Sequence, residues 1–471
     1  MLIKNIYVYE GENSEPQLRN VAIIASQSWK ILRTEAEWAE AELADPEQLD
    51  ANGCYTLMPG MLDAHVHGQG GIDFSAINSP DDLAAICLAL GATGLSYAMA
   101  TFVSLPIPLL KEKLSLLNEY LKREGLTGAT LLTGVHLEGP FISKDCKGAH
   151  DPNVLQDSIS IDVFRDIISA APEIKEWKVT LAPELPGAID FIKASKKLEE
   201  EGISVKVFLG HCNPDNLELI TEAIAAGAVG FTHLGNACRE TGSRKTDICT
   251  TKAVDSVLVR WVLQNPGRCP PGVELIVDGA HLSQSFVSLI FSAVPEKIVV
   301  VTDDLGAAGL PDGLYMLASL PVCKEQNSFY RVDEEGHFEM KAGAHGPERV
   351  LAGSAAPLSY CAEKFAEWIG PYAEKQNELM RFIYSGIVKN PRISSLSARA
   401  IANLPDEQNF VIFNKQGQLA LSMCQGSLIS HDGLKKAVKE VLPVVQSGFF
   451  AGSLAGQSSR SPGLNFTGPS F

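Results

Sequence analysis

Residues 205–236 read VKVFLGHCNPDNLELITEAIAAGAVGFTHLGN, and this stretch shows the pattern from which the fold is predicted. Val205–Leu209 is a short apolar run typical of a buried strand, and Val229–Thr232 is a second one. Leu217–Ala226, which lies between them, has the length and composition of a helix. A strand, a helix and a second strand in succession predict a parallel β-α-β unit. A histidine follows each of the two strands.

The same alternation continues on both sides of this unit. Further strand candidates are Gly94–Ala98, Thr133–Leu137, Trp177–Leu181, Glu274–Val277 and Ile298–Val301. Helical stretches lie between the strands at Ser79–Leu90, Leu105–Glu124, Ala188–Glu201 and Leu282–Val294. This number of units fits a closed (β/α)8 barrel of the TIM type, which we place at residues 58–400.

The two ends of the chain predict a second, smaller module. Lys4–Tyr9 and Asn20–Ile24 are rich in β-forming residues, and Asn409–Asn414 followed by Gln418–Leu421 has the pattern of a hairpin. We expect these segments to meet in one small β-sandwich module, with residues 1–57 as its first part and 401–447 as its return. Residues 35–50 are acidic and rich in alanine, which suggests a helix or a solvated insert. Residues 448–471 are rich in Gly, Ser and Pro, and we expect a disordered tail.

Charge and cysteine content limit the class of protein. The 471 residues carry 56 acidic and 39 basic side chains, for a formal net charge of -17. Such a chain should repel nucleic acid and anionic membranes, so an anionic substrate would need a local basic pocket. The ten cysteines are scattered and form no CxxC pair, which favours reduced thiols in a cytoplasmic protein. The sequence has neither the apolar region of a signal peptide nor a run of about 18 apolar residues.

Polar residues that can bind a metal follow most of the predicted strands. They are His65, His67, Glu138, His211, His233, His281 and Asp303. The carboxyl ends of the strands converge on one face of a parallel barrel, so these side chains should meet there. Histidine and carboxylate together are ligands for a divalent metal that activates water. One histidine at the end of a strand is usually an ordinary hydrogen-bonded residue, but a series at successive strands favours a metal-dependent hydrolase.

Several motifs resemble a known family. Asp63–Gly68, which contains His-x-His, resembles the opening motif of the amidohydrolase superfamily, and His136–Phe141 resembles a more specific motif of N-acetylglucosamine-6-phosphate deacetylases. Further matches, in chain order, are Lys147–His150, Ala182–Glu184, Gly210–His211, Thr232–Ala237, Val277–His281, Val301–Asp303, Ala307–Gly313 and Leu351–Ser354. The resemblance covers residues 55–360. It implies hydrolysis of the acetamide of N-acetyl-D-glucosamine 6-phosphate in amino-sugar catabolism.

The resemblance also implies roles for individual residues. Glu138, His211 and His233 would hold the main metal ion, and His65 and His67 would hold a second ion or line the site. Asp303 would be the general base and acid, and His281 would contact the sugar or the scissile carbonyl. The substrate-binding residues would be Ala149, His150, Asn236, Ala237, Arg244, Asp278, His281, Leu351, Ala352 and Gly353. Arg244 and His150 would serve the phosphate, and residues 351–353 the acetyl group.

The implied cofactor is a divalent ion, one or two per subunit. Zinc is the leading candidate, and iron, manganese or cobalt also suit these ligands. A homodimer is expected by resemblance, with the neighbouring subunit closing the phosphate pocket.

The chain departs from the family pattern at a few positions. Gly235 stands where an aromatic residue is usual, Cys238 where methionine is usual, and Asp304 where a small residue is usual. Residues 385–391 keep the Asn-Pro pair, but the glycine-rich return to the β module is missing. His337, His345 and His431 lie in polar sequence and are assigned no role.

Two alternatives remain open from the sequence. One is an amidohydrolase acting on a cyclic amide, an N-acyl amino acid or a galactosamine derivative. The other is a non-catalytic relative that keeps the barrel as an interaction scaffold.

Overall fold

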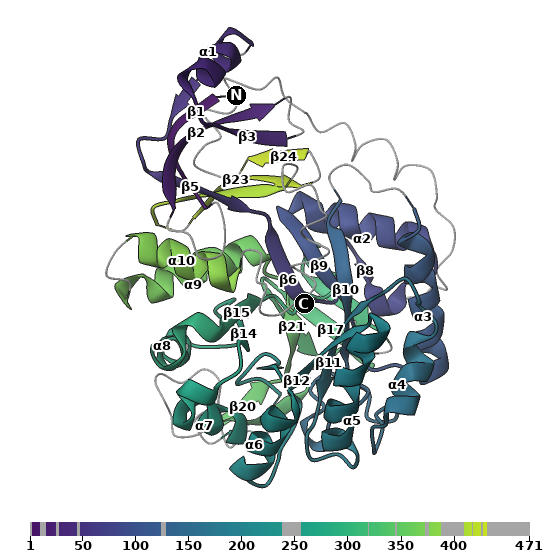
Figure 1. The fold of residues 1–471 in the computed structure, drawn as a ribbon. Coiled ribbons are helices and arrows are strands. Elements are labelled where there is room, and N and C mark those ends of the chain that lie inside the picture. The colour runs from purple at the N-terminus through teal and green to yellow at the C-terminus, as the bar shows by residue number, and fades with distance from the viewer. Residues whose placement is uncertain are drawn as a thin grey trace, which may run out of the picture.

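Figure 1 shows the computed structural model of the protein. The structure describes residues 2–9, 16–24, 28–44, 48–123, 129–237, 256–318, 320–343, 346–372, 376–387, 409–416, 418–424 and 427–430. Arg244, Cys238, His345, His431, Asn390, Pro391 and residues 448–471, all named above, lie outside the described residues.

Eight parallel strands form the expected barrel. They are β6 (Met61–Val66), β9 (Leu95–Phe102), β10 (Leu131–Glu138), β11 (Glu176–Leu181), β12 (Ser204–Leu209), β13 (Gly230–Phe231), β14 (Gly272–Ile276) and β15 (Ile298–Val301), and they pair in chain order. The first and last strands are joined at the carboxyl end of β6. There the amide of Asp303 donates to the carbonyl of His65 at 2.9 Å, and the amide of His67 donates to the carbonyl of Asp304 at 2.8 Å. The predicted (β/α)8 barrel is confirmed.

Helices cover the outside of this barrel (Figure 1). They are α2 (Pro80–Ala92), α3 (Ile107–Tyr120), α4 (Ile161–Ile168), α5 (Ala188–Ser195), α6 (Leu217–Ala226), α7 (Val257–Gln264), α8 (Gln284–Ala293), α9 (Leu358–Ile369) and α10 (Gln376–Gly386). The prediction for α6 matches to the residue, and its start is capped by Asn216, whose side chain accepts from the amide of Leu219 at 3.0 Å. Helices α4, α7, α9 and α10 were not predicted. The expected helix 188–201 changes to a 3-10 helix at Lys196–Glu201.

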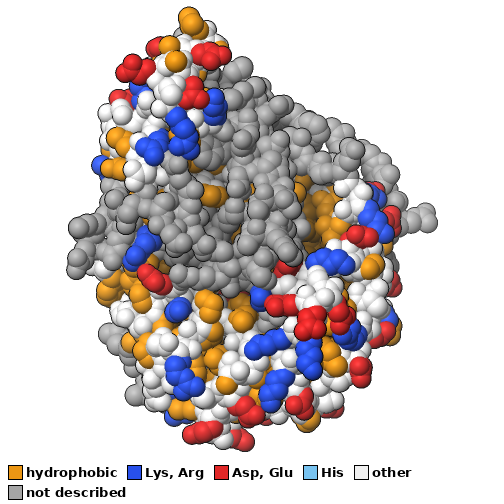
Figure 2. Space-filling model, viewed as in Figure 1, with side chains coloured by type: hydrophobic (Ala, Val, Ile, Leu, Met, Phe, Trp, Pro, Cys, Tyr) orange, Lys and Arg blue, Asp and Glu red, His pale blue; other side chains and the backbone are white. Residues whose placement is uncertain are grey.

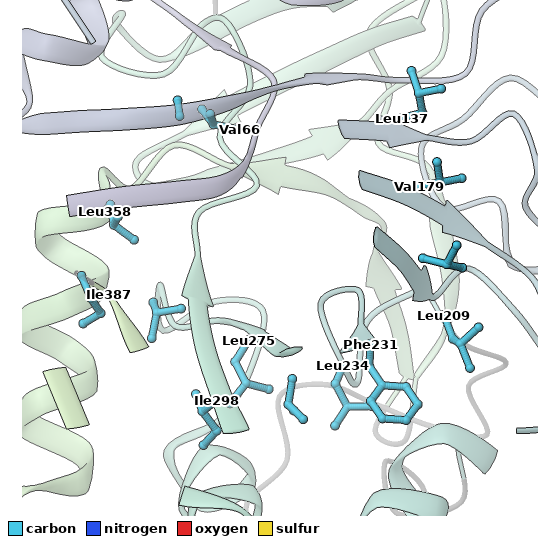
Figure 3. Close-up of a cluster of buried hydrophobic side chains, with 14 of the residues drawn as sticks. Val66, Leu137, Val179, Leu209, Phe231, Leu234, Leu275, Ile298, Leu358 and Ile387 are labelled. Atoms are coloured by element: carbon cyan, nitrogen blue, oxygen red, sulfur yellow. The ribbon is translucent and has the colours of Figure 1, made fainter. Parts of the chain in front are cut away.

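Alternate residues of each barrel strand face opposite sides, and this decides where the core lies. Leu137 and Val179, which are directly paired, belong to the large cluster that packs between strands and helices (Figure 3). Leu358 of α9 enters the same cluster. The barrel interior has a much smaller apolar group, namely Ala64, Met99, Phe208, Ile276, Val299 and Val301. The remaining inward positions are therefore available to polar side chains.

The β module combines both ends of the chain, as expected. Its strands are β1 (Leu2–Val8), β2 (Gln17–Ile24), β3 (Ser28–Leu32), β4 (Gln48–Asp50), β5 (Tyr55–Pro59), β22 (Phe410–Asn414), β23 (Leu419–Cys424) and β24 (Ser427–Ser430). They form one eight-stranded sheet in which β22 pairs with β5 and β5 pairs with β1. The acidic segment 35–50 contains a helix, α1 (Glu35–Ala44), and then β4. The domain boundaries given above stay predictions.

A small β insertion between β15 and α9 was not predicted. It contains β16 (Gly313–Leu317), β17 (Leu320–Glu325), β18 (Ser328–Arg331), β19 (Met340–Gly343), β20 (Gly346–Arg349) and β21 (Leu351–Ser354). The order β16-β17-β18-β21 makes one antiparallel sheet, and β19 and β20 pair as a hairpin. A further short pair, β7 (Gly68–Gln69) with β8 (Ile72–Asp73), follows β6. Because the insertion leaves the barrel at the carboxyl end of β15, it lies beside the expected site.

The exposed face of the barrel helices carries charge of both signs. Figure 2 shows Lys and Arg intermingled with Asp and Glu over this face. None of the described helices is both long enough and apolar enough to span a membrane. The seven cysteines whose side chains are described, at positions 54, 87, 146, 212, 269, 323 and 361, form no disulfide.

Phe231 offers a test of this packing. It is fully buried on the two-residue strand β13, and its ring lies 5.8 Å from that of Trp261 on α7. We expect Phe231→Ala to lower the free energy of unfolding by about 3–5 kcal/mol, because it leaves a cavity where strand and helix meet. The matched control is Leu88→Ala on α2, whose side chain is 43% exposed and should change stability by less than about 0.5 kcal/mol. Equal effects in denaturant unfolding would contradict this description of the core.

Candidate metal centre and cleft

A cleft of about 490 Å³, measured out to its open mouth, lies at the carboxyl ends of the barrel strands. It brings together most of the residues that the sequence singled out: His67, Glu138, Ala149, His150, His211, His233, Asn236, Ala237, His281, Asp303, Leu351, Ala352 and Gly353. His65 is fully buried beside it, and Asp278 lies behind His281. Arg244 lies outside the described residues. Val103, Gly148 and Leu317 also line the cleft and were not among the predicted site residues.

Glu138, at the end of β10, is the centre of the cluster. Its Oε1 lies 2.9 Å from His233 Nε2, 3.0 Å from His211 Nε2 and 3.4 Å from His65 Nε2. Its Oε2 lies 3.1 Å from His67 Nε2 and 3.4 Å from His150 Nε2. One buried carboxylate therefore faces five imidazole rings.

His211 shows what this arrangement requires. Its Nδ1 lies 2.9 Å from the carbonyl oxygen of Cys146, which can only accept, so Nδ1 carries a proton. In the neutral ring, Nε2 then presents a lone pair to Glu138 Oε1 and to His233 Nε2, both 3.0 Å away. These atoms repel one another unless positive charge lies between them. A divalent cation supplies that charge to several ligands at once, so the donor set fits a metal ion.

Asp303 forms a second group with the same carboxylate. Its Oδ1 lies 3.0 Å from His67 Nε2 and 3.3 Å from His65 Nε2. His65, His67, Glu138 and Asp303 each offer one atom to a cluster compact enough to hold an ion, and so do Glu138, His150 and His211. Glu138 belongs to both groups, and the two sets of ligands meet at this residue.

Electrostatics in the cluster follow from burial and from these contacts. Burial alone would raise the pKa of Glu138, but the charge of His65 and the hydrogen bond from His150 hold that pKa well below its usual range. The pKa of Asp303 is likewise lowered, against the effect of burial, mainly by His65. Burial opposes charge on His65, yet Glu138 and Asp303 raise its pKa to about 9. Burial lowers the pKa of His150 to about 4.

Backbone strain marks the ends of three strands. His211, His233 and Asp303 have φ angles of 48°, 28° and 58°, in the left-handed region that non-glycine residues rarely adopt. Such conformations persist where the surrounding structure holds them, and they occur often at functional sites. All three side chains line the cleft.

The side chain of Asp303 faces the histidines and not the loop that follows it. The amide of Asp304 donates instead to Thr302 Oγ1 at 3.1 Å, and the amide of Gly306 donates to Asp73 Oδ1 at 2.7 Å. The alternative in which Asp303 only caps this loop is therefore not supported by the geometry.

His281 is oriented by a neighbouring acid. Its Nδ1 lies 2.7 Å from Asp278 Oδ2, and Asp278 Oδ1 accepts from the amides of Ala280 and His281 at 2.8 and 2.9 Å. This arrangement leaves the other ring nitrogen of His281 for the cleft.

Two departures from the family pattern have physical counterparts. A Cβ atom at Gly235 would lie 2.8 Å from Cζ of Phe286, so the space beside this residue is already filled by an aromatic ring. Asp304 is buried, and burial together with the nearby Asp63 raises its pKa well above the usual value.

Comparison with known proteins gives a consistent result. No family profile matches the chain. An N-acetylglucosamine-6-phosphate deacetylase of Bos taurus is 30% identical over 372 residues, which cover 77% of this chain and 82% of the relative. The Vibrio furnissii enzyme of the same name is 32% identical over 274 residues, covering 58% and 63%. The crystal structure of the Mycobacterium smegmatis enzyme has a TM-score of 0.67 at 22% identity, covers 91% of this chain and all of that chain, and supports the fold.

Glu138→Gln tests the metal centre directly. Loss of a residue that only hydrogen-bonds to a metal ligand weakens metal binding by about 10- to 100-fold. We expect Glu138→Gln to weaken Zn²⁺ binding by more than this, because the shared carboxylate itself is lost. Chelator competition with elemental analysis would measure this. Glu184→Gln is the matched control, since Glu184 accepts from the amide of Asn213 at 2.6 Å, outside the cluster. Unchanged metal affinity in Glu138→Gln would contradict the assignment.

Proposed function

Because the chain belongs to the N-acetylglucosamine-6-phosphate deacetylase family of metal-dependent amidohydrolases, we propose that it hydrolyses the acetamide of N-acetyl-D-glucosamine 6-phosphate. The products are glucosamine 6-phosphate and acetate. The observation that carries this proposal is the lone pair of His211 Nε2, which faces Glu138 Oε1 at 3.0 Å within a buried cluster of histidines. An arrangement of this kind is suited to amide hydrolysis with a divalent ion.

The ion would be held by Glu138, His211 and His233, while His65 and His67 would hold a second ion or line the site. A bound divalent ion would polarise the amide carbonyl and make a nearby water molecule more acidic. We propose zinc, which commonly takes three protein ligands of this kind in catalytic sites, with iron, manganese or cobalt as alternatives.

Asp303 would move the proton. Its lowered pKa keeps the carboxylate ionised at neutral pH, so it can accept a proton from water and pass it to the leaving amine. His281, oriented by Asp278, would stabilise the oxygen on which negative charge develops, donating from Nε2 of the doubly protonated ring while Nδ1–H stays on Asp278. Both residues line the same cleft as Glu138.

The rest of the cleft would bind the sugar. Leu351, Ala352 and Gly353 offer a largely apolar wall for the acetyl group, next to Leu317 of the β insertion. Ala149, His150, Asn236 and Ala237 also line the cleft and would contact the sugar. We also propose that Arg244 binds the phosphate, that the protein is a homodimer, and that it works in the cytoplasm on amino-sugar phosphates.

Asp303→Asn tests the proton transfer. Asparagine has nearly the same shape but cannot accept the proton, so we expect turnover to fall by about 10² to 10⁴ with metal content and substrate affinity preserved. The neighbouring Asp304→Asn is the matched control. Since Asp304 is not among the described residues that line the cleft, turnover there should stay close to that of the unsubstituted protein. Near-normal turnover in a folded, metal-loaded Asp303→Asn variant would exclude the assignment.

Acetate release from a panel of substrates tests specificity and the role of Arg244. The panel contains N-acetylglucosamine 6-phosphate, its galactosamine epimer, the free sugars, an N-acetyl amino acid and a cyclic amide. We expect Arg244→Ala to reduce the preference for phosphorylated over free sugar by about 10- to 100-fold, since a hydrogen bond to a charged group contributes about 1.5–3 kcal/mol. Arg260→Ala, on the exposed side of α7, is the control.

The panel also separates the proposal from its alternatives. An unchanged preference in Arg244→Ala would place the phosphate site elsewhere. Activity only on the cyclic amide or the amino acid would favour a different amidohydrolase. Absence of activity on every compound, with metal bound, would favour a non-catalytic relative.

A further inference from the structure

Two charged residues lie in the barrel interior and have no part in the chemistry above. Lys178 on β11 and Glu274 on β14 form an ion pair, and both side chains are fully buried. Lys178 Nζ also donates to the carbonyl of Ala64 at 3.2 Å and lies 4.8 Å from the ring centre of Phe208. Burying two charges among apolar side chains opposes folding unless their contacts are very good.

The second oxygen of Glu274 points to the metal centre. Glu274 Oε2 lies 3.8 Å from Nδ1 of His65, just beyond hydrogen-bond distance, and neither atom has a hydrogen-bond partner among the described residues. The opposite nitrogen of the same ring, Nε2, faces Asp303 at 3.3 Å and Glu138 at 3.4 Å. The imidazole of His65 thus stands between Glu274 below it and the metal centre above it.

We propose that Glu274 is a positioning residue that orients His65 toward the metal, and that Lys178 holds Glu274 in place. With Glu274 as the acceptor for Nδ1–H, His65 keeps its proton on that nitrogen and presents the lone pair of Nε2 to the cluster. Lys178 binds both Glu274 and the carbonyl of Ala64, the residue before His65, and so connects the acceptor to the strand that carries the ring.

A purely structural role would not need these charges. The interior neighbours Ala64, Met99, Phe208, Ile276, Val299 and Val301 are apolar, and an apolar pair of similar volume often stabilises a protein as well as a buried ion pair does. What an apolar pair cannot supply is a hydrogen-bond acceptor for His65. This difference makes the inference testable. It rests on the metal centre of the proposed function.

The test compares two double variants that both lack the buried charges. In Lys178→Met with Glu274→Gln, the side chain at position 274 keeps an acceptor oxygen. In Lys178→Met with Glu274→Met, it has none but has a similar volume. We expect the second variant to bind Zn²⁺ about 10- to 100-fold more weakly than the first. This is the usual effect of removing the residue that hydrogen-bonds to the other ring nitrogen of a metal-binding histidine. Both should have similar melting temperatures in the absence of metal.

The same pair in a His65→Ala background shows whether the effect passes through His65. We expect the difference between glutamine and methionine at position 274 to vanish there. Equal Zn²⁺ affinity of the two double variants, or an undiminished difference without His65, would overturn the inference. Should methionine at 274 prevent folding, Glu274→Leu gives the same comparison. If the unsubstituted protein bound no Zn²⁺, the metal centre and this inference would both be overturned, whereas the other outcomes concern Glu274 alone.

Discussion

Two backbone hydrogen bonds at the seam of the barrel determine most of what this site can do. The carbonyl of His65 accepts from the amide of Asp303, and the amide of His67 donates to the carbonyl of Asp304. They join segments more than 230 residues apart in sequence, at the point where the first and last strands meet. Closing the barrel therefore places Asp303 against the two histidines in the same step. Thr302 adds a side-chain bond to Asp63 at 2.7 Å across the same seam.

The two faces of each barrel strand differ: the outward side chains are mostly apolar, and most of the polar side chains point inward. Each strand sends alternate side chains to the helices, where they form the main hydrophobic core, and the intervening ones to the barrel axis. On β10 this places Leu137 outward and Glu138 inward. An isolated carboxylate at this depth would be very unfavourable, but five imidazoles surround it, and the charge of His65 and the bond from His150 hold its pKa low. The histidines and the acid thus depend on one another, and the balance of charge fits a bound cation.

Below the metal centre the interior holds a further layer of polar contacts. His136 lies 3.2 Å from Thr101 Oγ1 and 2.7 Å from Thr180 Oγ1, and Thr180 lies 2.7 Å from Thr232. Beside this chain stands the ion pair of Lys178 and Glu274. These contacts hold the strands that carry the candidate ligands in place. Side chains on such strands are positioned more precisely than side chains on loops.

The sequence by itself determined the barrel, the β module made from both chain ends, and most of the residues that line the cleft. Those conclusions rest on local patterns, namely apolar runs of strand length, helices between them and a polar residue just after each strand. The β insertion, the helices α4, α7, α9 and α10, and the pairing of Lys178 with Glu274 were decided only by the tertiary structure. Lys178 and Glu274 are 96 residues apart, and each looks like an ordinary interruption of an apolar strand. Periodicity shows which side of a strand a residue faces, but not which residue stands opposite it, because that depends on how the barrel closes.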